Sequence, residues 1–110
     1  MNMEKMTNKT REALVNAQQL AIEHQNNELR VLHVLAALLR DPEGLVASIV
    51  GKLGVSSSLF IQNVEQALQQ LPRVQGGDQQ LYQSGEFSAL LVEAARQAEA
   101  MQDEYISLIL

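Results

Sequence analysis

Apolar side chains recur every three or four residues along most of this chain, a spacing that predicts helices separated by short polar breaks. The first helical face comprises Ala13, Leu14, Ala17, Leu20, Ala21 and His24. Thr7 precedes it as an N-cap residue, because its hydroxyl can accept a hydrogen bond from a free amide of the first turn. The polar sequence Gln25-Asn26-Asn27 follows the face, so we expect the helix to end there.

The next segment, residues 31–39, is apolar on nearly every side except at His33, which is typical of a helix in the middle of a core. Asp41-Pro42-Glu43 then has the pattern of a helix start, with an N-cap, a proline at the first helical position and an acid near the positive end of the dipole. The helix that it starts carries Leu45, Val46, Ile49, Val50 and Leu53. Gly54 is its expected C-terminal stop.

A fourth helix is predicted from Ser57 or Ser58 up to Pro72, which cannot continue it. Residues 73–83 contain Gly76-Gly77-Asp78 and are mostly polar, which indicates a linker. A fifth helix opens at Ser84, and its apolar face comprises Phe87, Leu90, Leu91, Ala94, Ala95, Ala98 and Met101. We expect a turn at Gln102-Asp103-Glu104.

Shifting the sequence by 77 residues aligns the first helix with the fifth. Leu14 then falls on Leu91, Ala17 on Ala94 and Ala21 on Ala98, while the cap Thr7 falls on Ser84 and Leu29 on Ile106. The matching caps and polar turns indicate an all-α fold built as a pseudo-twofold repeat of small helical bundles. Residues 1–110 would form one domain, with residues 1–72 as the first repeat, 73–83 as the linker and 84–110 as the beginning of the second repeat.

The predicted second repeat is incomplete. Its counterpart of residues 31–39 would have to be supplied by Ser107-Leu108-Ile109-Leu110 alone. We favour the interpretation that the chain is a fragment of a longer protein. The other interpretation is a short chain that completes itself by dimerising or by swapping a segment.

Composition narrows the class of protein. Hydrophobic residues make up 46% of the chain but aromatic residues only 4%, so the core must be aliphatic. With no cysteine there are no disulfides and no thiolate metal sites. The net charge of −5 argues against nucleic acid as the main partner. The N-terminus lacks the apolar run of a signal peptide, and no apolar stretch is long enough for a membrane span. We therefore expect a soluble, cytoplasmic protein or a piece of one.

Catalytic and metal-binding patterns are missing from the sequence. Gly51-Lys52 is followed by Leu53 where a P-loop needs Ser or Thr. His24 and His33 lie nine residues apart without a third ligand at metal spacing. We expect His24 near a helix C-terminus and His33 hydrogen-bonded within or beside the core. For Asp103-Glu104, a solvated turn is favoured over an acidic group beside an apolar groove. The sequence therefore predicts a protein that is not an enzyme and holds no metal or cofactor.

Two segments resemble the N-terminal domains of ClpB-type AAA+ disaggregases, the Clp repeat domain. One is the Leu32-His33 sequence with Ala36-Ala37-Leu38-Leu39, and the other, more specific, is Ala67-Leu68 followed by Leu71-Pro72-Arg73-Val74. The opening Thr7-Asn8-Lys9 is also similar. The resemblance covers essentially the whole chain and consists of the pattern and order of these segments.

The resemblance implies a non-catalytic domain that engages unfolded or aggregated polypeptides and helps to deliver them to a hexameric AAA+ ring, whose own modules bind ATP and Mg²⁺. An alternative is a docking domain for a folded adaptor protein of a Clp-type unfoldase. The implied substrate-binding positions are the polar Thr7 and Asp103 together with the groove residues Phe87, Leu90, Leu91 and Leu110. The chain departs from the family at Ile109, where an acidic residue is common, and this puts the acidic rim of the groove in doubt.

Overall fold

The computed structural model describes residues 8–41, 43–54, 56–74 and 80–109. Within these residues the chain forms α1 (Asn8–Glu23), β1 (Glu28–Leu29), α2 (Val31–Leu39), α3 (Leu45–Lys52), α4 (Ser57–Gln69), β2 (Tyr82–Gln83) and α5 (Gly85–Ile109). Helices dominate, and the only sheet among the described residues is the short pair β1–β2. The predicted all-α class is thus confirmed, whereas the division into two repeats stays a prediction.

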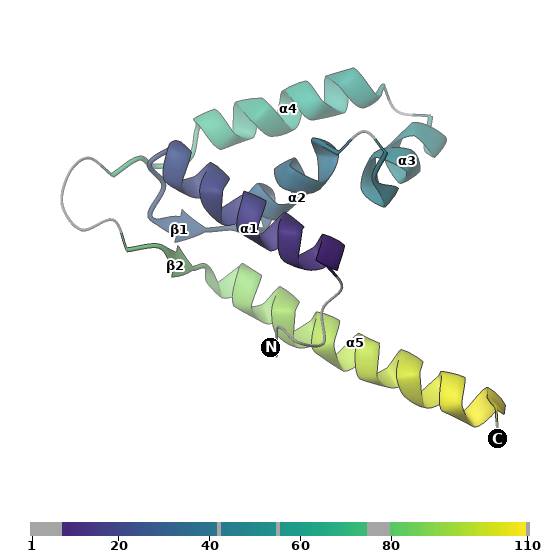
Figure 1. Ribbon diagram of the computed structural model, residues 1–110. Coiled ribbons are helices and arrows are strands. Elements are labelled where there is room, and N and C mark those ends of the chain that lie inside the picture. Colours follow the sequence, from purple (N-terminus) through teal and green to yellow (C-terminus); the bar gives the residue numbers. More distant parts are fainter. Residues whose placement is uncertain (1–7, 42, 55, 75–79, 110) are drawn as a thin grey trace.

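The core lies where α1, α2 and α4 meet, with α2 in the middle of the bundle (Figure 1). Alanines are among the most buried residues of this core, with Ala17 and Ala21 of α1 and Ala36 of α2 almost completely buried. Their small side chains let the two helices approach closely, and larger residues fill the space toward α4 and α5. The buried cluster comprises Ala17, Leu20, Ala21, Leu29, Ala36, Ala37, Leu39, Val50, Val64, Leu68 and Phe87. The central position predicted for residues 31–39 is therefore confirmed.

The predicted start of the third helix at Asp41-Pro42-Glu43 is wrong. α3 begins at Leu45, and Gly44 is its N-cap. Asp41 forms a local turn instead, because its Oδ1 accepts a hydrogen bond from the Glu43 amide at 3.1 Å and its carbonyl accepts one from the Gly44 amide at 3.0 Å. Asp makes this bond both as an N-cap and in an isolated turn, and here the helix begins only at Leu45. The predicted stop is confirmed, since Gly54 has a φ of 76°, in the left-handed region that glycine adopts at little cost.

α4 begins at Ser57, as predicted, and Ser56 caps it by accepting a hydrogen bond from the Leu59 amide. Its last residue, Gln69, precedes Pro72 by three positions. Arg40, at the end of α2, donates to both carboxylate oxygens of Glu65 on α4 at 3.0 and 3.1 Å. This bidentate contact fixes the end of α2 against the middle of α4.

The predicted linker ends in a strand. β2 lies parallel to β1, with Glu28 opposite Tyr82 and Leu29 opposite Gln83. A strand of two residues is too short to produce a pattern of alternating side chains, which is why the sequence did not indicate it. Its effect is nevertheless large, because β2 leads directly into α5 and fixes where that helix starts.

α5 starts at the position that the sequence predicts and continues past its predicted end. The hydroxyl of Ser84 accepts a hydrogen bond from the Phe87 amide at 3.0 Å, so Ser84 is the expected cap. The turn expected at Gln102-Asp103-Glu104 is wrong, because α5 continues through these residues to Ile109. The helix contains neither glycine nor proline after Gly85, and polar residues alone do not end a helix. Its far end projects beyond the other helices (Figure 1).

Candidate functional site

The candidate site is the apolar face of α5, which is anchored in the core at its N-terminal end. Phe87 is 2% exposed and belongs to the buried cluster. One turn further on, Leu91 is partly buried and packs against the same cluster. The first two turns of α5 are therefore fixed to the helical bundle, and they determine the direction in which the rest of the helix projects.

Apolar side chains of α5 are exposed to solvent both within these first two turns and beyond them. Leu90 is 42% exposed and Met101 is 67% exposed. At about 100° per residue, they share a sector of about 100° around the helix with Leu91, Ala94 and Ala98. We call these five residues the α5 stripe. An apolar stripe on a projecting helix presents a surface that another polypeptide can cover.

A polar face of α5, formed by Glu93, Arg96 and Gln97, lies beside the α5 stripe and forms its own hydrogen bonds. Arg96 donates to both carboxylate oxygens of Glu93, at 2.8 and 3.1 Å, and Gln97 donates to the same carboxylate at 3.0 Å. The bonds from Arg96 and then from Gln97 hold the pKa of Glu93 below its ordinary value. Because these groups already bond one another, the polar face has less to offer a partner than the α5 stripe has.

The structure locates three of the six predicted site residues in full. Leu90 and Leu91 lie on the α5 stripe, whereas Phe87, on the same face about one turn earlier, is buried in the core. That these residues line a groove stays a prediction. For Asp103 only the helical backbone is described, and Thr7 and Leu110 lie outside the described residues. Their contacts with a bound polypeptide stay a prediction.

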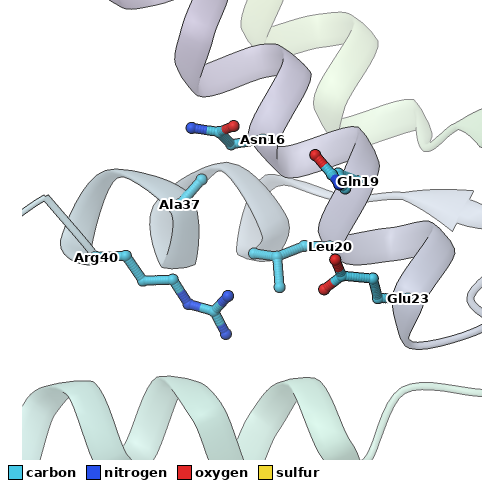
Figure 2. Close-up of a pocket in the computed structure, with 6 residues that line it drawn as sticks. All are labelled: Asn16, Gln19, Leu20, Glu23, Ala37 and Arg40. Carbon is cyan, nitrogen blue, oxygen red and sulfur yellow. The ribbon is translucent and has the colours of Figure 1, made fainter.

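A shallow pocket of about 250 Å³ lies elsewhere, along α1 and α2 (Figure 2). Leu20 and Ala37 contribute apolar surface to it. Its other lining residues are polar and comprise Asn16, Gln19, Glu23 and Arg40. The Arg40 guanidinium is already occupied by Glu65. This pocket therefore does not match the apolar groove that the sequence predicts.

A buried hydrogen-bond relay connects α2, the turn after α1 and the segment after α4. The Arg30 amide donates to His33 Nδ1 at 3.0 Å, and His33 Nε2 lies 2.9 Å from Asn26 Oδ1. Asn26 Nδ2 in turn donates to the Pro72 carbonyl at 3.0 Å. We call His33, Asn26 and the backbone groups of Arg30 and Pro72 the His33 relay. The sequence predicted a hydrogen-bonded core histidine, which is confirmed, but its partners are set by the fold and could not be read from spacing.

The described part of the chain has neither a candidate metal-binding cluster nor a candidate membrane-spanning helix. There, no group of three or more His, Cys, Asp or Glu side chains gathers to hold a metal ion. Over the same residues, no helix is both long enough and apolar enough to cross a membrane.

Comparison with known proteins identifies similar sequences. Residues 5–108 match the family described as the Clp repeat (R) N-terminal domain. The chain is 38% identical over 110 residues to a chaperone protein ClpB of Bacillus anthracis, 37% identical to one of Bacillus cereus, and 32% identical over 108 residues to one of Meiothermus ruber. These alignments cover 97–98% of this chain but only 13% of each relative.

Proposed function

Because the chain belongs to the Clp repeat N-terminal domain family, we propose that it binds unfolded or aggregated polypeptide segments and helps to deliver them to the ATP-driven ring of a ClpB-type disaggregase. The observation that carries this proposal is the α5 stripe, where Leu90 and Met101 are exposed on a helix that projects from a packed bundle. The domain itself performs no chemical step in this proposal.

An apolar, shallow surface suits a partner of variable sequence. A protein that must bind many unfolded chains needs adaptable apolar contacts more than precisely placed polar groups. Leucine, methionine and alanine supply such contacts on the α5 stripe, and the polar residues of α5 lie on another face. A site for a single small ligand would instead need an enclosed pocket with convergent polar groups.

The same physics predicts weak binding. Full burial of one apolar side chain contributes about 1.5–3 kcal/mol, and Leu90, Leu91 and Met101 are the only large apolar side chains of the α5 stripe. Ordering the bound segment offsets much of that gain. We expect a dissociation constant on the order of micromolar or weaker.

Other parts of the activity belong to the rest of a ClpB-type protein. The chain spans 13% of the length of the relatives named above. We assign binding of ATP and Mg²⁺, and assembly into a hexamer, to modules outside this domain. In this proposal the domain works in the cytoplasm on protein clients, with no role for nucleic acid or membrane.

The test is a titration with a reduced, alkylated protein that cannot fold, using Leu90→Gln and the matched variant Val92→Gln. Val92 is 70% exposed and points away from the α5 stripe, so it controls for the loss of an exposed apolar residue on α5. We expect Leu90→Gln to weaken binding about fivefold, which corresponds to about 1 kcal/mol of lost apolar contact. Val92→Gln should bind within about twofold of the unchanged chain.

Two results would contradict the proposal. Equal weakening in both variants would mean that the α5 stripe is not the binding surface. Nanomolar binding to one folded partner, without any response to unfolded chains, would favour the adaptor-docking alternative. Thermal melts run in parallel separate a binding effect from a stability effect, because a loss of stability in Leu90→Gln that matches its loss of binding would assign Leu90 to packing.

A further inference from the structure

We infer that His33 is a positioning residue for α5: its imidazole holds both ends of β1, and the β1–β2 pairing passes that constraint to the start of α5. The consequence for client binding rests on the function proposed above, because it is the α5 stripe that would be positioned. The positioning itself is a property of the fold and can be tested without a client.

The first step is the tautomer of His33. Its Nδ1 accepts a hydrogen bond from the Arg30 amide at 3.0 Å, so Nδ1 carries no proton. Nε2 must then carry the proton of the neutral ring and donate it to Asn26 Oδ1, 2.9 Å away. Asn26 stands two residues before β1, and Arg30 directly follows it. One buried side chain thus fixes the backbone on both sides of the strand.

The second step leads from β1 to α5. The Tyr82 amide donates to the Asn27 carbonyl at 2.9 Å, and the Ser84 amide donates to the Leu29 carbonyl at 3.0 Å. Ser84 is also the cap of α5, since its hydroxyl accepts from the Phe87 amide. Only this one residue separates β2 from α5. A shift of β1 would therefore move the cap and the first turn of the helix.

The third step is the tie to α4. Asn26 Nδ2 donates to the Pro72 carbonyl at 3.0 Å, and the Val74 amide donates to the Gln25 carbonyl at 2.7 Å. His33 is completely buried and Asn26 is 7% exposed. The hydrogen bond between His33 and Asn26 is therefore shielded from water, and a buried group left without a partner is costly. The relay thus joins the segment that leaves α4 to the strand that precedes α2.

The hydrogen bonds of the His33 relay require a neutral imidazole. Lowering the pH therefore tests the relay, whereas a role in packing alone would predict no such pH dependence. A second proton on Nδ1 would make it a donor facing the Arg30 amide, another donor. Burial above all lowers the pKa of His33 below the ordinary value of 6.5, and the charges of His24 and Arg30 lower it further. Glu28 and Glu86 lie nearby but contact Arg30, at 3.7 and 3.9 Å.

The pH dependence follows from that direction. Below pH 6.5 the unfolded chain takes up a proton at this histidine while the folded chain resists it, so the stability falls as the pH falls toward the folded-state pKa. Above pH 6.5 both states are neutral at this position, and the contribution is fully present.

The test is amide hydrogen exchange by NMR on the whole chain without a client. Tyr82 and Ser84 report the β1–β2 pairing, and the Phe60 amide, which donates to the Ser56 carbonyl, reports α4. In His33→Leu we expect exchange at Tyr82 and Ser84 to accelerate at least tenfold more than at Phe60. Asn26→Ala cuts the same relay outside α2 and should give the same pattern, so it serves if His33→Leu does not fold.

A third arm uses the unchanged protein at pH 7 and pH 5, with exchange rates corrected for intrinsic pH dependence. We expect protection at Tyr82 and Ser84 to fall more than at Phe60, and this extra loss to disappear in Asn26→Ala. Equal changes at all three amides, in the variants or on acidification, would show a merely structural histidine and overturn the inference. A chain that shows the expected exchange pattern but does not bind unfolded proteins would refute only the proposed function.

Discussion

α1 and α5 carry similar residues at a shift of 77, yet α1 ends after Glu23 whereas α5 runs through the corresponding position to Ile109. At the end of α1, Gln25 adopts a φ of 59°, and the Asn26 amide donates back to the Ala21 carbonyl at 2.9 Å. At the same shift, Gln25 corresponds to Gln102, which is helical in α5. Similar local sequence therefore gives a turn in one place and a helix in the other.

The difference is explained by what lies around the turn. Asn26 is held by His33 and by the Pro72 carbonyl, which lie 7 and 46 residues away from it in the sequence. The residues at the matching positions are Asp103 and Leu110. A leucine side chain can neither donate nor accept a hydrogen bond, so the His33 relay has no equivalent there. The end of α1 is therefore fixed by tertiary hydrogen bonds more than by its own polar residues.

The largest loss of stability is expected from Phe87→Ala, which tests whether α5 is anchored differently from α1. α1 is buried at several positions, including Ala17, Leu20 and Ala21, whereas among the α5 side chains whose burial is described, Phe87 is the one large side chain that is fully buried. Removing its ring should destabilise the protein by about 3–5 kcal/mol. Urea unfolding measures this cost. Met101→Ala, at the exposed end of the same helix, should stay within about 0.5 kcal/mol, and comparable losses in both variants would mean that α5 is anchored along its whole length.

A smaller effect is expected from the two caps, which occupy matching positions before α1 and α5. Ser84 is buried and accepts a hydrogen bond from the Phe87 amide, so Ser84→Ala should cost about 1–2 kcal/mol. Thr7→Ala, predicted from the sequence alone, should cost about 1 kcal/mol. Chemical denaturation compares them.

Ser88→Ala is the control for the caps, because the Ser88 hydroxyl is exposed and bonds only the side chain of Gln83 in the described structure. Its cost should be within about 0.5 kcal/mol. If Thr7→Ala behaves like this control, Thr7 does not cap α1 and the match between the two helix starts is lost.

Local signals in the sequence predicted the helices, the start of α4 near Ser57, the cap Ser84 and the stop at Gly54, because each depends on the nearest few residues. Three features were not predicted from the sequence. Asp41 bonds its own turn instead of capping a helix, β2 has no pattern of its own, and α5 continues where α1 turns. The last two depend on partners far away in the sequence. Of the candidate site, the sequence placed Leu90 and Leu91 on one face, but the burial of Phe87 depends on how α5 meets α2.

The smallest effect and the most direct test of the comparison come from the same substitution at matched positions, Gln25→Gly and Gln102→Gly. Gln25 is held in the left-handed region, where a side chain costs about 1 kcal/mol that glycine avoids. Gln25→Gly should therefore stabilise the protein by up to about 1 kcal/mol, after glycine's greater freedom in the unfolded chain is counted against it. Gln102 lies inside a helix, where glycine costs about 1 kcal/mol, so Gln102→Gly should reduce the helix content of α5.

Chemical denaturation measures the stability of Gln25→Gly, and circular dichroism measures the helix content of Gln102→Gly. An alanine variant at each position is the control, and its effect should be opposite to that of glycine. Alanine favours a helix and disfavours the left-handed region, so Gln102→Ala should keep or raise helix content and Gln25→Ala should not stabilise. If glycine instead stabilises at both positions, α5 turns at Gln102 as α1 turns at Gln25. The two helix ends would then be alike, and a turn would form without the His33 relay, which would leave local sequence as the cause in both places.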